Sequence, residues 1–573
     1  MEPMEKRRFD VNREEVAREE IARTRVKRPF ARVLIALFLV AIFGVPVVQM
    51  LWSLRKEGVE VAVFSPETPG ASAHFMADSS RGSFVSRLLQ GNRRLIEAKT
   101  RFEDRLQEQS FLRKLLTPPF QALLLHGLRS GNEKAIPARD GWLFYESDVR
   151  FLTNGVYQPE LAFASERAHN SVPLPIDSIS RGPLGAIIRF ARELNQRNIT
   201  LVVMPIPVKP MLYPEPLGRF KEQTTLRLPS LMQWQETLAK EGILLFDCTP
   251  VLEGLKGEGV PVFLKTDTHW TPEAMEATAD GLSQLLRDNG LAPAPDSLLF
   301  VRENQSINGV GDIVTMLELE SGRQLYPPEE VALCPVFTKS GEVWMPSRGS
   351  EILFLGDSFS NIYSLEGMGW GASAGFAEQL SWHLQAPVDA IRRNDAGASA
   401  TRRILSNELQ RGIDRLESKK VVVWSFAMRE LAFGNWDDVS MALGKPRDSQ
   451  FLRLQPGDSL WVTGQVVARS ASLVPEKVIY ADHLIAIHLT DVASENGSLS
   501  GGQAVVYLQD MKGRRLGPAA SLRPGDRIRL LLKSWEAVSP RYSGFNRSEL
   551  DDFALQLEEP VWGEHLATTA DLP

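Results

Sequence analysis

Residues 351–360, Glu-Ile-Leu-Phe-Leu-Gly-Asp-Ser-Phe-Ser, decide how we interpret the fold of this chain. The apolar run is typical of a strand that is buried on both faces of a parallel sheet. It ends abruptly at Gly356, a residue that permits a tight turn, and Ser358 follows two positions later. The pattern therefore predicts a serine at the carboxyl end of a buried strand, which is a position suited to a nucleophile.

Helical and extended patterns alternate on both sides of this run. We expect helices at residues 184–197, 230–241, 272–289, 374–384 and 401–418, and strands at 200–205, 243–247, 352–355, 388–391 and 421–426. Such alternation predicts an α/β domain in which helices cover both faces of a parallel sheet. Polar residues that follow the strands should then gather at one edge of the sheet, where ligands bind in such folds.

A second motif, Thr-Asp-Thr-His-Trp-Thr-Pro at residues 266–272, supplies a histidine and a carboxylate. Asp267 and His269 are two positions apart, so their side chains lie on one side of an extended segment. Thr271 and the proline after it predict the start of a helix that fixes this loop. Because a serine needs a base to take its proton and a third group to orient that base, we predict acyl transfer with Ser358 as the nucleophile, His269 as the base and Asp267 as its partner.

Other interpretations of these motifs stay open. A Gly-Asp-Ser sequence after a strand also fits an ordinary turn in which Asp357 or Ser358 caps the next helix. His383 is a rival base, although it falls inside the predicted helix 374–384, where packing is the commoner role.

Three further polar residues follow or end predicted strands at the same edge. We interpret Lys209, Tyr213 and Arg429 as groups that contact a substrate, the alternative being a solvated or structurally paired side chain. Trp142 and Trp270 could stack on sugar rings, but core packing is the usual fate of tryptophan.

Further motifs accompany these two in the same order along the chain. They are residues 140–145, 205–209, 213–215, 311–312, and 424–429 with Leu431. Over about residues 85–435 the chain resembles the alginate O-acetyltransferase family, typified by the alginate acetylation proteins J and X, whose Asp-His pair also precedes the serine. The resemblance implies an SGNH-hydrolase-like three-layer α/β domain, and it gives Ser358, His269 and Asp267 the same three roles. The backbone N–H of Ser358 and that of Gly311 are the candidate oxyanion donors.

By this resemblance the acyl group is acetyl, donated by a membrane-bound O-acyltransferase partner and passed to a hydroxyl of a polysaccharide acceptor. No cofactor and no metal are expected. The function we predict is O-acetylation of an exopolysaccharide or a cell-envelope glycan. A carbohydrate acetylesterase would use the same triad with water as acceptor, and a non-catalytic glycan-binding scaffold is the third alternative.

The composition supports a folded protein that does not bind nucleic acid. Of the 573 residues 43% are hydrophobic, which suffices for more than one core. The net charge of −6 argues against a nucleic-acid partner. The two cysteines, Cys248 and Cys334, fit no metal-binding spacing, and their pairing stays open.

The N-terminal region predicts a membrane anchor. Residues 33–51 carry no charge and are long enough to cross a bilayer, while residues 23–32 are strongly basic. We therefore expect a cytoplasmic tail at 1–32, a transmembrane helix at 33–52, a linker at 53–83 and a periplasmic domain at 84–445, tethered to the inner membrane by a single pass. The alternative is a cleaved signal peptide.

A separate β domain is expected at residues 448–566. Period-two patterns run through 459–467, 478–489, 503–509 and 527–532, and the sequence Pro-Gly-Asp at 456–458 recurs at 524–526. Repeated turns of this kind predict a small barrel or sandwich. The segment 542–550 is either a binding loop or an ordinary connection.

Overall fold

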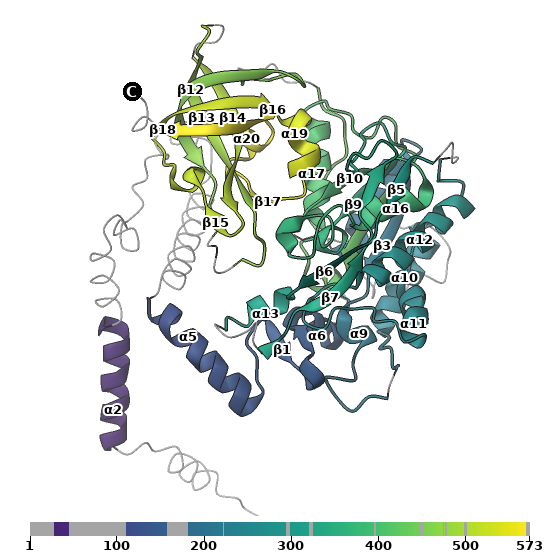
Figure 1. Ribbon diagram of the computed structural model, residues 1–573, viewed down its shortest axis with the longest axis vertical. Coiled ribbons are helices and arrows are strands. Elements are labelled where there is room, and N and C mark those ends of the chain that lie inside the picture. Colours follow the sequence, from purple (N-terminus) through teal and green to yellow (C-terminus); the bar gives the residue numbers. More distant parts are fainter. Residues whose placement is uncertain are drawn as a thin grey trace, which may run out of the picture. The chain divides into compact units, whose positions relative to one another are not determined.

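The structure is a computed structural model, and its chain divides into two compact units, Met1–Ala122 and Leu123–Pro573 (Figure 1). It describes residues 28–44, 111–156, 182–221, 223–293, 298–319, 325–394, 397–445, 451–473, 475, 478–497 and 501–568. The expected linker 53–83 and most of the expected cytoplasmic tail lie outside the described residues.

The first unit contributes two described helical segments. Residues 33–44 of the expected transmembrane helix lie in α2 (Arg28–Leu39), which begins in the basic segment, and in the π-helix Val40–Gly44 that continues it. Residues 45–52 of that expected helix lie outside the described residues. The second helix is α5 (Phe111–Leu123). Among the described residues, no helix combines the length and the apolar character that crossing a membrane would require.

A five-stranded parallel sheet forms the centre of the second unit. Its strands are β3 (Thr200–Ile206), β4 (Leu244–Leu245), β9 (Ile352–Gly356), β10 (Asp389–Arg392) and β11 (Val421–Ala427). They lie in the order β10-β9-β11-β3-β4, and every neighbouring pair is parallel. The predicted parallel α/β sheet is confirmed, with β9 next to the middle strand.

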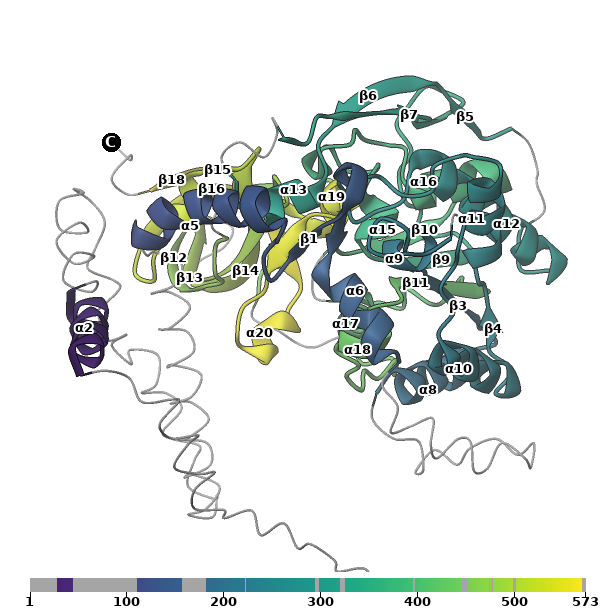
Figure 2. The same ribbon diagram turned by 90° about the horizontal axis from the view of Figure 1, so that it is seen from below.

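Helices cover both faces of this sheet, as Figure 2 shows. One face packs against α8 (Pro183–Asn195), α10 (Pro229–Lys240) and α17 (Ser399–Gln410), and the other against α11 (Thr249–Gly257), α12 (Pro272–Asp288) and α16 (Phe376–Leu384). Within β3, Val202 and Met204 pack on the side of α11, α12 and α16. Leu201 and Val203 pack on the side of α8, α10 and α17. This alternation is the strand period of two applied to a sheet buried on both sides.

The expected helix 401–418 is shorter than predicted. It ends at Gln410, and the backbone N–H groups of Gly412 and Ile413 return to Leu409 and Glu408. Gly412 has a φ of 87°, the left-handed conformation that commonly ends a helix.

Short elements that the sequence patterns did not predict surround the carboxyl edge of the sheet. They are the hairpin β1 (Ala135–Pro137) with β2 (Leu143–Tyr145), α6 (Glu146–Asn154), α9 (Lys209–Leu212), β5 (Phe300–Arg302) with β8 (Val336–Thr338), β6 (Gln305–Gly309) with β7 (Glu329–Leu333), α13 (Asp312–Met316), α15 (Ser358–Asn361) and α18 (Glu430–Phe433).

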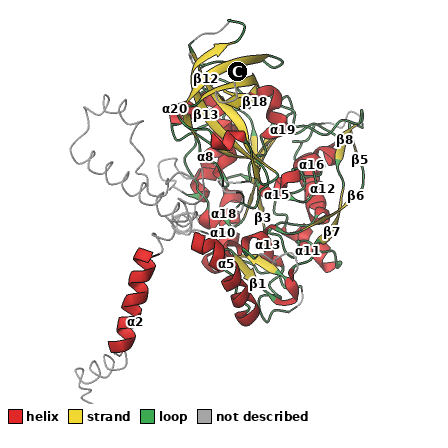
Figure 3. Ribbon diagram, turned by 60° about the vertical axis from the view of Figure 1, so that its left-hand side comes forward, coloured by secondary structure: helices red, strands yellow, loops and turns green. Residues whose placement is uncertain are grey.

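The C-terminal part is a closed barrel of mostly antiparallel strands, of which Figure 3 labels β12, β13 and β18. Its strands are β12 (Ser459–Arg469), β13 (His483–Ser494), β14 (Gly502–Lys512), β15 (Arg515–Leu516), β16 (Arg527–Ser534), β17 (Asn546–Ser548) and β18 (Pro560–Thr568). The order β15-β14-β18-β16-β12-β13-β17 closes because β13 also pairs with β14. Both Pro-Gly turns hold a left-handed glycine, Gly457 at φ 98° and Gly525 at φ 101°.

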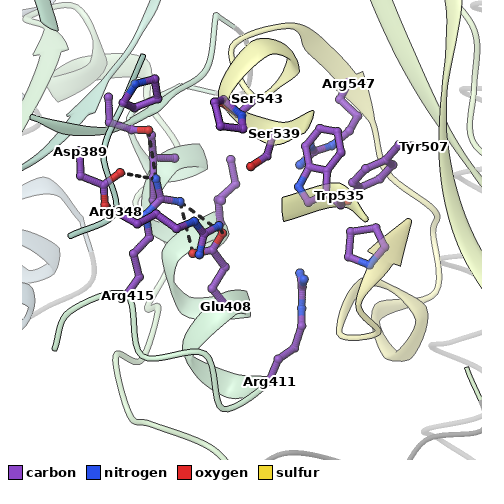
Figure 4. Close-up of a pocket in the computed structure, with 16 residues that line it drawn as sticks. Arg348, Asp389, Glu408, Arg411, Arg415, Tyr507, Trp535, Ser539, Ser543 and Arg547 are labelled. Atoms are coloured by element: carbon purple, nitrogen blue, oxygen red, sulfur yellow. Dashed lines mark hydrogen bonds and ion pairs between the residues drawn. The ribbon is translucent and has the colours of Figure 1, made fainter. Parts of the chain in front are cut away.

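The segment 542–550 contains β17 and the last residue of α19 (Trp535–Tyr542), so four of its nine residues are regular structure and the other five connect or follow these elements. Figure 4 shows Ser539 of α19 and Ser543 lining a pocket together with Glu408 of the α/β domain. On the α/β side Arg415 pairs with Asp389 at 2.7 Å and with Glu408 at 3.2 Å. A hydrogen bond of 2.9 Å from Arg393 to the carbonyl of Arg547 joins the two domains.

Candidate active site

Ser358 begins α15 immediately after β9, as the strand-then-glycine pattern predicts. Asp357 is the N-cap of this helix, and its side chain accepts hydrogen bonds from the backbone N–H of Phe359 at 3.0 Å and of Ala427 at 2.9 Å. Of the two residues that could cap this helix, Asp357 and Ser358, the cap is therefore Asp357. The serine hydroxyl is left for another partner.

Ser358, His269 and Asp267 lie in one hydrogen-bonded line. The Nε2 of His269 is 2.9 Å from the Ser358 Oγ, and its Nδ1 is 2.6 Å from the Asp267 Oδ1. All three side chains are buried. Because a carboxylate can only accept, Nδ1 of the neutral ring carries the proton and Nε2 is left to accept one from the serine.

The helix after His269 fixes the loop that carries it. Thr271 is the N-cap of α12, and its hydroxyl accepts a hydrogen bond from the Ala274 N–H at 3.3 Å. Pro272 is the first helical residue. This predicted helix start is confirmed.

The second carboxylate oxygen of Asp267 has two donors of its own. The backbone N–H of Asp312 and the indole Nε1 of Trp370 both lie 2.9 Å from Oδ2. Glycines make these approaches possible, since a Cβ on Gly309 would come within 2.5 Å of the Trp370 ring, and one on Gly311 within 2.1 Å of the Thr266 backbone. The Oδ1 of Asp267 also accepts a hydrogen bond from the His269 backbone N–H at 3.1 Å. The carboxylate of Asp267 therefore takes part in four hydrogen bonds.

Burial and charge act in opposite directions on this pair. Burial by itself would lower the pKa of His269, but the hydrogen bond and the negative charge of Asp267 outweigh it and raise that pKa above 6.5. Burial alone would raise the pKa of Asp267, and the contacts with His269 hold it below its ordinary value instead. The site thus favours an ionised carboxylate beside a readily protonated ring.

Asp312 is a second carboxylate close to the histidine. Its Oδ2 is 4.0 Å from Nδ1 of His269, and its two oxygens accept hydrogen bonds from the backbone and the hydroxyl of Thr268. Burial, with the charge of Asp267, raises the pKa of Asp312 to about 6. These three acidic and imidazole groups could gather round a cation, but only by giving up the hydrogen bonds just described.

Lys209 does not face a substrate, contrary to our expectation. Only 1% of the residue is exposed, and its ammonium donates to the carbonyls of Leu143 at 2.7 Å and Lys265 at 3.3 Å. Burial lowers the pKa of Lys209 to about 8, although neighbouring carboxylates, Asp267 first among them, act to raise it. Through Lys265 the ammonium of Lys209 stabilises the loop that carries His269.

The aromatic candidates are also largely structural. The Tyr213 hydroxyl accepts a hydrogen bond from the Val262 N–H at 3.1 Å, and its ring stacks on Trp142 at 4.5 Å. Trp270 is fully buried and donates to the Phe359 carbonyl at 3.0 Å, so core packing, not sugar stacking, is its role.

Arg429 lies beside the nucleophile and is paired. It forms an ion pair of 3.0 Å with Asp148, which is 1% exposed, and its guanidinium lies 5.7 Å from the Phe359 ring and 5.4 Å from the Tyr145 ring. Its side chain remains 15% exposed. Of the three expected substrate-contacting residues, Arg429 and Tyr213 are partly exposed, whereas Lys209 is buried.

The two candidate oxyanion donors differ. The backbone N–H of Ser358 donates to no acceptor within the described chain, so it is free to bind an oxyanion. The N–H of Gly311 already donates to the Thr266 hydroxyl at 3.2 Å. Gly311 therefore serves close packing, and the expectation of an oxyanion donor there is wrong.

The remaining candidates lie outside this hydrogen-bonded line. His383 pairs with Asp280 on α12 at 3.2 Å, and Cys248 and Cys334 are both free thiols. Sequence reasoning missed the roles of Asp148 and Trp370, and it quoted Asp312 only as part of a motif.

Comparison with known proteins gives a consistent result. Over residues 135–428 the chain matches the family described as SGNH hydrolase-like domain, acetyltransferase AlgX. A probable alginate O-acetylase AlgJ of Pseudomonas aeruginosa is 26% identical over 335 residues, which are 58% of this chain and 78% of the relative. The protein of the same name from Pseudomonas syringae pv. tomato is 25% identical over 375 residues, or 63% of this chain and 86% of the relative.

Two solved structures are also similar. The O-acetyltransferase domain of Pseudomonas putida AlgJ aligns with a TM-score of 0.39 and 22% identity, covering 53% of this chain and 94% of that domain. Pseudomonas aeruginosa AlgX aligns with a TM-score of 0.35 and 16% identity, covering 77% of this chain and 92% of AlgX.

Proposed function

Because the chain belongs to the family of SGNH hydrolase-like domains of the acetyltransferase AlgX, we propose that it moves acetyl groups onto hydroxyls of a polysaccharide through an acetyl-serine. Membership in this family confirms the resemblance drawn from the motifs. The observation that carries the proposed chemistry is the contact of 2.9 Å between the His269 Nε2 and the Ser358 Oγ. Relatives named alginate O-acetylases favour alginate, or a polysaccharide with similar hydroxyls, as the acceptor.

The first half of the reaction forms the acetyl-enzyme. The Ser358 Oγ attacks the carbonyl carbon of an acetyl ester while Nε2 of His269 takes its proton. The negative charge that develops on the carbonyl oxygen can be received by the free Ser358 N–H. The bond to the donor oxygen then breaks, and that oxygen leaves with the proton from His269.

The second half repeats these steps with a sugar hydroxyl as the nucleophile. His269 removes the proton of the hydroxyl, which attacks the acetyl carbon, and the Ser358 Oγ leaves protonated. Asp267 stabilises the imidazolium that forms in both halves. Its four hydrogen bonds restrict its position, which suits a role in orienting the ring.

The setting of the reaction is part of the proposal. The basic residues 23–32 before the apolar segment favour a cytoplasmic N-terminus and a periplasmic catalytic domain tethered to the inner membrane. A membrane-bound O-acyltransferase would then supply the acetyl group, as the family resemblance implies.

The test uses the full chain, an activated acetyl ester as donor and an alginate oligosaccharide as acceptor. Mass spectrometry of the oligosaccharide measures transfer, and free acetate measures hydrolysis. Transfer that exceeds hydrolysis at saturating acceptor is expected. Faster hydrolysis under those conditions would favour the esterase alternative, whereas inactivity toward both acceptors would favour a scaffold.

A further inference from the structure

A second line of aspartate, histidine and serine side chains lies in the C-terminal barrel. The Nδ1 of His483 is 2.7 Å from the Asp510 Oδ1, and its Nε2 is 3.0 Å from the Ser548 Oγ. The same atoms are joined in the same order around His269, at 2.6 and 2.9 Å. The first line lies on the loop before α12 and at the start of α15, whereas the second lies on strands β13, β14 and β17.

The irregular pairing of β13 brings these residues together. His483 faces Met511 on β14, but Leu484 faces Gln509, so Asp510 is the extra residue of a β-bulge. Bulges redirect side chains, and this one directs a carboxylate onto the histidine. On the other side of β13, the parallel strand β17 ends at Ser548.

The exposed fraction of the side chains in this line increases from the carboxylate to the hydroxyl. Asp510 is 0% exposed and His483 is 1% exposed, whereas Ser548 is partly exposed. Since the carboxylate can only accept, the neutral ring holds its proton on Nδ1 and takes the serine proton at Nε2. A hydroxyl near the surface that donates to a buried, oriented imidazole is the arrangement of an activated nucleophile.

A cavity adjoins the strand that carries this serine. Asn546 lines a cavity of about 330 Å³ together with Tyr145 and Tyr480. Asn546 and Ser548 lie on the same face of β17, about 7 Å apart along the strand. The cavity therefore gives room for a small ligand beside the strand that ends at Ser548.

We propose that Ser548, His483 and Asp510 form a second acyl-transfer site that accepts a small acyl group from a carboxylic ester. The Ser548 Oγ forms a bond to the acyl carbon, and its proton passes to Nε2 of His483. The bond between the acyl carbon and the alcohol oxygen breaks, and the alcohol leaves with that proton. Water or another alcohol then reverses these steps and frees the serine.

The test is independent of the site in the α/β domain, because it uses the full chain carrying Ser358→Ala. The protein is treated with p-nitrophenyl acetate, digested with trypsin and analysed for acetylated peptides. Ser548 is the sole serine of the tryptic peptide 548–573, and Ser543 is the sole serine of the peptide 542–547. Ser543, labelled in Figure 4, is an internal control, since it is also partly exposed and no histidine is among the described residues that line the pocket around it.

Acetylation of Ser548 should be at least about 100-fold faster than that of Ser543, the lower range of the effect of a positioned general base. Replacing His483 by Gln in the same background should bring the two rates together. Equal rates at the two serines before that replacement would overturn the proposal, and this comparison requires no change in the barrel. A fast rate at Ser548 that survives His483→Gln would also overturn it.

Discussion

The indole of Trp370 donates a hydrogen bond of 2.9 Å to the carboxylate of Asp267, a residue 103 positions earlier in the chain. Trp370 is fully buried, and Gly309 on β6 lies against its ring. The bond occupies the oxygen that faces away from His269, so it can orient the carboxylate without competing for the imidazole.

Replacing Trp370 by Phe removes this donor while keeping an aromatic ring. The buried Oδ2 of Asp267 would keep only the Asp312 N–H, and loss of one hydrogen bond to a buried charged group costs about 1–3 kcal/mol of stability. We expect kcat for acetyl transfer to fall about 10-fold, since the carboxylate is held less firmly. Trp382→Phe on α16 is the matched control, and the same loss in both variants would assign the effect to packing.

The three aligned residues should act as a unit. Ser358→Ala or His269→Ala is expected to lower kcat by about 10⁶-fold, and Asp267→Asn by about 10⁴-fold, by analogy with other triads. The double variant of Ser358 and His269 should be no slower than either single variant. Thermal unfolding checks that the fold persists, and multiplicative losses in the double variant would contradict the acyl-serine mechanism.

The rate should depend on pH through His269. Only the neutral ring accepts the serine proton, and the pKa of His269 is raised above 6.5 because Asp267 outweighs burial. The value of kcat/KM should therefore fall tenfold per pH unit as pH drops below a midpoint above 6.5, and level off at higher pH. In Asp267→Asn the midpoint should move down, since the charge that raises it is gone. A midpoint that stays in place would assign the titration to another group, such as Asp312.

The anchor proposed for the N-terminus predicts the side of the membrane on which the fold lies. Alkaline phosphatase fused after Trp52 should be active, because the basic residues 23–32 hold the N-terminus in the cytoplasm. Fluorescence of a green fluorescent protein fused at the same point would contradict this orientation. A mature chain that starts near residue 55 would indicate a cleaved signal peptide.

The sequence located the elements that carry the proposed chemistry because local patterns determine them. The apolar run and glycine before Ser358 indicated the end of β9, and the Thr-Pro pair after His269 indicated the start of α12. The end of β9 and the start of α12 are each determined by a few neighbouring residues in the sequence. Their meeting at one site followed from the parallel sheet and from the family resemblance.

The surroundings of the site could not be predicted in this way. Trp370 meets Asp267 through loops without periodic pattern, and the register of such loops is set by tertiary packing. Lys209 follows a strand as many exposed lysines do. Its ammonium is satisfied by the carbonyl of Leu143 on β2 and by that of Lys265 in a loop, and no sequence pattern predicts these two contacts. In the barrel, Asp510 reaches His483 only because of a bulge, which the period of two cannot reveal.

Arg429 remains a candidate for contact with the acceptor, but its ion pair with Asp148 complicates a simple test. Replacing it by Met leaves Asp148 buried and unpaired, which should cost about 3–5 kcal/mol of stability. Adding Asp148→Asn removes the buried charge and should restore most of that loss. Chemical denaturation measures both effects.

The paired variant then separates binding from folding. If Arg429 positions the polysaccharide, Arg429→Met with Asp148→Asn should raise KM for an oligosaccharide acceptor about 10-fold, the effect of losing roughly 1.4 kcal/mol of binding, while sparing hydrolysis of a small activated ester. The matched control replaces Arg197 by Met and Asp414 by Asn, an ion pair near the opposite end of the sheet, where β3 begins. This control should leave both activities intact. Equal loss of transfer and hydrolysis in the Arg429 pair, with the control unaffected, would instead place Arg429 in support of Ser358 and His269, because both activities depend on those two residues.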